Sequence, residues 1–150
     1  MRDRDAHRAA ISVTADYLVQ DAEGPREPID WTIEFSRRAR GLAVYATLRA
    51  LGRDGVAELV DRLCACAERF AAGLADRGFE VLAQGLNQVV VARGGDDATL
   101  ATLAAVQADG TCYPSGTTWR GRRGIRLSVC NWQTTFADID RSVAAIAAAA

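Results

Sequence analysis

The stretch IRLSVC at residues 125–130 alternates strictly between apolar and polar side chains. Side chains of a β-strand point alternately to the two faces of a sheet, so we expect Ile125, Leu127 and Val129 to share a buried face. Arg126 then points to the opposite face. The sequence therefore predicts a half-buried strand that carries an arginine on its outer side.

The residues that follow this strand predict a helix beginning near Thr134 or Thr135. Asp138 lies three residues after Thr135, where a carboxylate can complete a variant of the capping box. An apolar stripe at helical spacing should face the core. Its members are Phe136, Ile139, Val143 and Ile146.

The residues before the alternating stretch predict further strands. Residues 79–82 and 88–92 are both rich in strand-forming side chains, and three successive valines in the second indicate a strand covered on both faces. Another strand can begin at residues 111–113, before the Pro-Ser-Gly sequence at 114–116, which is typical of a turn. We therefore expect at least four strands.

Three more helices are expected upstream of the last strand. One spans 35–51, ends at Gly52 and has apolar residues on almost every side, which predicts a largely buried helix. The next begins with Asp54 as its N-cap and ends at Gly78. A third covers 97–108. In these helices the apolar positions expected to face inward are Val56, Leu59, Val60, Leu63, Phe70, Leu74, Leu100 and Leu103.

The order of helices and strands predicts an α+β fold. A chain of 150 residues with 49% hydrophobic side chains has the composition of a single globular core. We expect a small antiparallel or mixed sheet with helices layered on one face. Residues 1–34 are interpreted as a loop-rich arm with a short strand at 10–13, and residues 35–150 as the folded domain. An arm of this length is typical of a lid or of an attachment to another part.

The charge balance argues against nucleic-acid binding. The 18 basic and 19 acidic residues give a net charge of −1. A basic run at Arg37, Arg38 and Arg40 opens the first long helix, and we interpret it as structural or interfacial. No apolar tract is long enough to cross a membrane, and the charged N-terminus lacks the apolar stretch of a secretion signal. These features predict a cytoplasmic protein without a membrane or nucleic-acid partner.

All 18 basic residues are arginine, and the sequence contains no lysine. Arginine stays protonated in proteins, so the side chains of this chain offer no free amine for a Schiff base. His7 is the single histidine, and the four cysteines show no CxxC spacing. We therefore predict no zinc site and interpret the cysteines as reduced, small apolar residues.

Two residues stand out as candidates for chemistry. Arg126 could bind a carboxylate through its planar fork, or it could form a structural salt bridge or simply be exposed. Tyr17 could donate a proton from a mobile loop, or it could be an ordinary packing residue. The residue pattern alone leaves both alternatives open.

Three blocks, taken together, resemble a known family. They are SVTADYL at 12–18, EFSRRARGLAVYATLRAL at 34–51 and PSGTTWRGRRGIRLSVCNWQTTFADI at 114–139. Their order is similar to that of the group II pyridoxal-phosphate-dependent amino-acid decarboxylases, which include the aromatic-amino-acid and glutamate decarboxylases. The resemblance covers essentially the whole chain but only the C-terminal part of the family. It implies the small C-terminal domain of the fold-type I, aminotransferase-like architecture.

The resemblance also implies roles for individual residues. Tyr17 matches the tyrosine of the family's mobile catalytic loop, which is thought to protonate the reacting carbon after carbon dioxide leaves. Arg126 matches an arginine that binds the substrate carboxylate in some members. Arg37, Arg38 and Arg40 match a basic run with a structural or interfacial role. The family is dimeric, which implies a homodimer in which the loop reaches the neighbouring subunit.

The family's cofactor is pyridoxal 5'-phosphate, held by a lysine in a large domain that precedes the matched part. We therefore expect a C-terminal fragment of a decarboxylase, from a truncated, split or partial reading frame, that is inactive alone and needs a complementary large domain to act on an amino-acid substrate. The alternative is a free-standing, non-catalytic binding module. Without its neighbours, the helix at 35–51 should expose an apolar patch.

Overall fold

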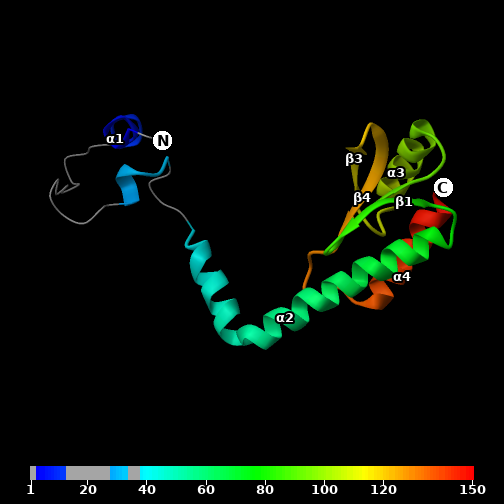
Figure 1. Cartoon of the computed structure of the whole chain (residues 1–150), viewed down its shortest axis with the longest axis horizontal. Helices are drawn as coiled ribbons and strands as arrows, with labels where there is room; N and C mark the ends of the chain where they lie inside the picture. The colour runs from blue at the N-terminus through cyan, green and yellow to red at the C-terminus, as the bar shows by residue number, and fades with distance from the viewer. Residues whose placement is uncertain (1–2, 13–27, 34–37) are drawn as a thin grey trace. The chain divides into compact units, whose positions relative to one another are not determined.

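A computed structural model describes residues 3–12, 28–33 and 38–150 (Figure 1). The chain divides into two compact units, Met1–Thr47 and Leu48–Ala150, and the second contains the sheet. Tyr17 and Arg37 lie outside the described residues.

The first unit begins with helix α1, Arg4–Ile11. Asp3 caps it, because its Oδ1 accepts the backbone N–H groups of Asp5 and Ala6, each at 3.0 Å. The strand predicted at residues 10–13 is therefore wrong where the structure describes it, since the helix continues to Ile11. A 3₁₀ helix, η1, follows at Pro28–Asp30.

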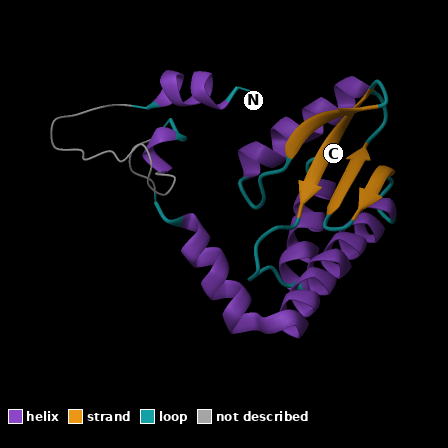
Figure 2. Ribbon diagram, turned by 60° about the vertical axis from the view of Figure 1, so that its left-hand side comes forward, coloured by secondary structure: helices purple, strands orange, loops and turns teal. Residues whose placement is uncertain are grey.

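The second unit is built on a four-stranded antiparallel sheet with the order β1-β2-β4-β3 (Figure 2). This confirms the predicted α+β class and resolves the antiparallel-or-mixed alternative. The strands are β1, Glu80–Gly85; β2, Gln88–Ala92; β3, Ser115–Trp119; and β4, Arg122–Ser128. Its helices are α3, Asp96–Asp109, and α4, Phe136–Ala148, together with the part of helix α2, Arg40–Ala75, that begins at Leu48.

The core lies between the helices and one face of the sheet. The inward residues of β2 and β4 belong to one buried cluster with apolar side chains of α2, α3 and α4. Figure 2 shows these helices layered against the sheet. The alternation in β4 is confirmed: Ile125 and Leu127 are buried, whereas Arg126 is exposed. In β2 the expected burial on both faces is wrong, since Val89 and Val91 are buried but Val90 is only partly covered.

Helix α2 contains the break that the sequence predicts at Gly52. This residue has φ 65° and ψ −172°, a left-handed φ that glycine adopts without a steric penalty. Helical conformation resumes immediately after Gly52, so Asp54 is not the N-cap. Beyond Ala75 the chain turns at Gly78, which also has a positive φ of 82°.

The part of α2 before Gly52 is exposed, which corrects the prediction of a largely buried helix. Leu42 and Tyr45 are 68% and 61% exposed. An apolar residue on every side of a helix predicts burial only where other elements surround that helix, and among the residues that the structure describes these side chains stay uncovered. The exposed apolar patch expected of this helix is therefore present. It consists of Leu42, Val44, Tyr45, Leu48 and Leu51.

Two positions predicted to face inward are exposed instead, namely Val60 of α2 and Leu100 of α3. The buried face of α3 is formed by Thr99, Thr102 and Val106. Thr99 tolerates burial because its hydroxyl accepts the Arg93 N–H at 3.0 Å and donates to the Arg93 carbonyl at 3.2 Å.

Helix α4 confirms its predicted start. Thr135 is the N-cap and forms a capping box with Asp138. Ile139, Val143 and Ile146 are buried as expected, but Phe136 at the first turn is 48% exposed.

The four cysteines are free. Within residues 3–12, 28–33 and 38–150, no group of three or more acidic, histidine or cysteine side chains could hold a metal ion. No helix in these ranges combines the length and apolar character needed to span a membrane.

Candidate functional site

The hairpin of β3 and β4 determines where Arg126 lies. Its turn consists of Arg120 and Gly121, with φ values of 48° and 84°, as a two-residue type I′ turn requires. Such a turn sets the register of both strands, and Ser115 lies directly opposite Arg126. The expected strand at 111–113 is wrong, because β3 starts at Ser115, inside the predicted turn.

Arg126 lies on the sheet face that the helices leave open. Its Nε–H donates to the hydroxyl oxygen of Ser115 at 3.2 Å. A guanidinium has five N–H donors, and the four on the terminal nitrogens of Arg126 form no hydrogen bond or ion pair with a described residue. The salt bridge considered from the sequence is therefore absent among these residues, and the fork is exposed.

The surface beside Arg126 is lined by small and apolar groups. Val90 of β2 pairs with Arg126 in the sheet register. A Cβ built at Gly124 would lie 2.7 Å from Val90 Cγ1 and 3.5 Å from Leu82 Cδ1, so only glycine permits this close packing. The guanidinium thus adjoins a patch that could contact the apolar part of a ligand.

Two arginines of this unit, Arg122 and Arg69, illustrate the paired state. On the open face, Arg122 Nη1 contacts Glu80 Oε1 at 2.7 Å. At the helices, Arg69 forms a bidentate pair with Asp140 at 2.6 and 2.8 Å. The hydrogen bond from Arg69 lowers the pKa of Asp140 below its ordinary value. The guanidinium groups of Arg122 and Arg69 are therefore already paired, whereas the terminal nitrogens of Arg126 remain available to a ligand.

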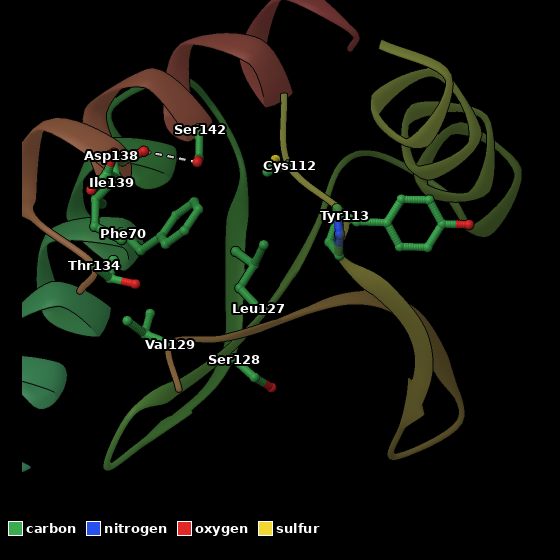
Figure 3. A pocket seen from close by; sticks show the side chains of 11 residues that line it. Phe70, Cys112, Tyr113, Leu127, Ser128, Val129, Thr134, Asp138, Ile139 and Ser142 are labelled. Carbon is green, nitrogen blue, oxygen red and sulfur yellow. Dashed lines mark hydrogen bonds between the residues drawn. The ribbon is translucent and has the colours of Figure 1, made fainter. Parts of the chain in front are cut away.

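A cavity of about 210 Å³ lies elsewhere in the same unit, between α2, α4 and the end of β4 (Figure 3). Phe70, Leu127 and Ile139 form much of its apolar lining. Asp138 also lines it, but its carboxylate is committed to the capping box, and the Thr135 hydroxyl lowers its pKa. Arg126 does not line this cavity.

Cys112 and Ser142 supply further polar atoms to the cavity. Burial raises the pKa of the Cys112 thiol, which keeps it protonated and weakly nucleophilic at neutral pH. The Ser142 hydroxyl donates to the Asp138 carbonyl at 2.8 Å, as the dashed line in Figure 3 shows. The Asp138 carboxylate and the Ser142 hydroxyl are therefore both engaged in hydrogen bonds within α4 and its cap.

The two candidate residues differ in where they lie. Arg126 is placed as the alternation predicts, and Tyr17 lies outside the described residues. Arg38 and Arg40 are exposed at the start of α2. Sequence reasoning missed Ser115, which it assigned to a turn. The register of a tight hairpin around Arg120 and Gly121 could have identified it.

Comparison with known proteins identifies the class of protein to which this domain belongs. Residues 1–93 match the pyridoxal-dependent decarboxylase conserved domain. The chain belongs to this family of decarboxylases.

Individual relatives agree with that assignment. The chain is 31% identical to 3,4-dihydroxyphenylacetaldehyde synthase of Drosophila melanogaster over 145 residues, which cover 91% of this chain and 28% of that protein. It is 29% identical to histidine decarboxylase of the same organism, covering 93% of this chain and 17% of that one. The chain therefore spans less than a third of either relative.

A solved structure supports the fold. The crystal structure of Oryza sativa TDC with PLP and tryptamine matches with a TM-score of 0.70 at 19% identity, covering 88% of this chain and 30% of that one. This likeness shows that the chain shares its fold with the corresponding part of that structure.

Residues 1–150 contain no lysine side chain of the kind that anchors the family's cofactor. A pyridoxal aldehyde is anchored by a primary amine, and the sequence contains no lysine. What the described residues do offer is an exposed guanidinium beside an apolar patch.

Proposed function

We propose that residues 48–150 form the carboxylate-binding domain of a pyridoxal-phosphate-dependent amino-acid decarboxylase, with Arg126 binding the carboxylate of the amino-acid substrate. The observation that carries the proposal is the exposed fork of Arg126, whose terminal nitrogens are unpaired among the described residues. A planar guanidinium can donate two parallel hydrogen bonds to a carboxylate. Charge-assisted hydrogen bonds of this kind contribute about 1.5–3 kcal/mol each.

The arm carries the second part of the proposal. Tyr17 acts as the proton donor to the reacting carbon, and the arm reaches the active site of a neighbouring subunit in a homodimer. Support comes from the ADYL sequence at residues 15–18 and from membership of the family. A phenol has an O–H group that can donate a proton.

The catalytic amine must come from elsewhere, because this chain has no lysine. A complementary large domain, in the same or another polypeptide, would supply it. Residues 1–150 are therefore inactive as a decarboxylase when alone.

The carboxylate site can be tested on the chain itself. The probe is sodium acetate, titrated into protein with ¹⁵N-labelled arginine side chains, and the readout is the Nε–H signal of each arginine by NMR. Arg126→Gln identifies the Arg126 signal by its loss, and Arg123→Gln serves as the matched control on the same strand. We expect saturable acetate shifts at Arg126 that persist in the control. No shift at Arg126, or shifts no larger than those of the other exposed arginines, would refute the site.

The need for an added amine is tested separately. The purified chain is incubated with pyridoxal phosphate and a set of amino acids, and carbon dioxide release is measured together with the absorbance of a covalent cofactor adduct. We expect neither signal. Carbon dioxide release by the chain alone would show that it needs no complementary domain.

One alternative is a free-standing module that binds an amino acid without reacting it, and the absence of lysine favours it. The DNA adjoining the gene distinguishes the two. A neighbouring frame that encodes a lysine-bearing large domain supports the decarboxylase, and an isolated gene with its own promoter supports the module.

A further inference from the structure

We infer that Ser115 is the positioning residue of Arg126 and that the pair presents the two terminal guanidinium nitrogens end-on to a carboxylate. This inference rests on the proposed function and adds to it the residue that sets the geometry of the site. Ser115 and Arg126 are direct partners across β3 and β4, and the Arg126 Nε–H donates to the Ser115 hydroxyl at 3.2 Å.

The hydrogen bond at Nε decides which edge of the guanidinium is free. An arginine can bind a carboxylate side-on, through Nε and one terminal nitrogen, or end-on, through both terminal nitrogens. Ser115 occupies Nε and so removes the side-on edge. The remaining edge, Nη1 and Nη2, is the one that a ligand carboxylate can approach with two parallel hydrogen bonds.

The choice of a hydroxyl also preserves the charge of the site. Glu80 on the same face neutralises Arg122, and Asp140 neutralises Arg69. Ser115 restrains Arg126 without a negative charge, so the guanidinium keeps its full attraction for an anion. An arginine side chain has many rotamers, and restraining it beforehand lowers the entropic cost of ordering it on binding.

The hairpin contains a matched control on its opposite face. Thr118 and Arg123 are also direct cross-strand partners, and Arg123 Nη1 donates to the Thr118 hydroxyl at 3.2 Å. This second pair lies beside Asp96, whose Oδ1 accepts the Arg123 backbone N–H at 3.0 Å. The two pairs share their chemistry, but Arg123 has a carboxylate nearby.

The experiment compares Ser115→Ala, Ser115→Thr and Thr118→Val in the full chain. The first readout is the solvent-exchange rate of the Arg126 Nε–H by ¹⁵N NMR, and the second is the acetate dissociation constant at the same signal. We expect Ser115→Ala to accelerate exchange at least threefold and to weaken acetate binding at least twofold. Ser115→Thr keeps the hydroxyl and should restore both values, and Thr118→Val should change neither.

The outcomes separate this inference from the proposed function. Unchanged exchange and acetate binding in Ser115→Ala would overturn the positioning role while leaving Arg126 as the carboxylate ligand. Failure of acetate to shift the Arg126 signal in the unmodified chain would instead overturn the proposed function. If Ser115→Ala does not fold, the exchange rate and the acetate dissociation constant are compared between Ser115→Thr and Ser115→Val. Only the threonine retains an acceptor for Nε–H, so equal values in the two variants would overturn the positioning role.

Discussion

The two faces of the sheet differ in their surroundings, so neighbouring residues of β4 either pack in the core or lie exposed. Ile125 and Leu127 are 0% and 4% exposed and pack under the helices, whereas Arg126 between them is exposed on the open face. Burial of apolar area stabilises the fold, and an exposed guanidinium contributes little to stability. Substitutions one residue apart should therefore separate folding from binding.

The largest expected effect is on the helix-covered face. Ile125→Ala removes a fully buried side chain from the centre of the core. Truncations of this kind cost about 2–5 kcal/mol, because the transfer free energy is lost and a cavity remains. Urea denaturation followed by circular dichroism measures the change. A loss below about 1 kcal/mol would mean that the core relaxes around the missing side chain.

On the open face, a substitution at Gly124 should also lower the free energy of unfolding. Gly124→Val would place a Cβ 2.7 Å from Val90 Cγ1, too close for either side chain to remain in place. Overpacking typically costs about 1–3 kcal/mol. Because the clash is with one side chain, Val90→Ala in the same protein should recover part of the loss in a double-mutant cycle. Strict additivity of the two substitutions would show that Val90 is not the obstacle.

A smaller effect is expected at the start of α4, a helix that covers the core. Thr135→Ala removes the N-cap hydroxyl that accepts the Asp138 N–H, at a cost of about 1 kcal/mol. Thermal unfolding measures it. Thr135→Ser, which keeps the hydroxyl, is the matched control and should lie close to the unmodified chain.

The same capping box predicts a pH dependence. The Thr135 hydroxyl lowers the pKa of Asp138 in the folded state, so this contribution to stability is present above the ordinary aspartate pKa. It is lost as the pH falls through the folded-state pKa. Unfolding curves at pH 7 and in acid should therefore differ less for Thr135→Ala than for the unmodified chain, and an equal difference would contradict the coupling.

The smallest effect on stability is expected at Arg126 itself. Arg126→Gln alters an exposed side chain and should change the free energy of unfolding by no more than about 0.5 kcal/mol. It should nevertheless abolish the acetate response. A loss of stability as large as that of Ile125→Ala would end the distinction between the two faces.

Local patterns predict the elements that local interactions determine. Alternation identifies the inward and outward sides of β4, and the spacing of Thr135 and Asp138 identifies the capping box. Both features arise within a few neighbouring residues. The antiparallel arrangement of the sheet agrees with the short connections within its hairpins.

Non-local interactions explain what the sequence reasoning missed. The position of Ser115 depends on pairing with β4 across a turn. The exposure of Leu42 depends on what surrounds the helix, which its own sequence does not encode. The amino-acid composition does not show which of these side chains are buried and which are exposed.

The two edge strands of the sheet affect the tendency of the protein to aggregate at high concentration. Strands β1 and β3 border the sheet, and each edge could accept a strand from another molecule. The register of β1 shifts between Val81 and Ala83, which interrupts the regular row of donors and acceptors there. Strand β3 is regular but short. Intermolecular sheet extension, and the aggregation it causes, should therefore begin at β3 when it begins at all.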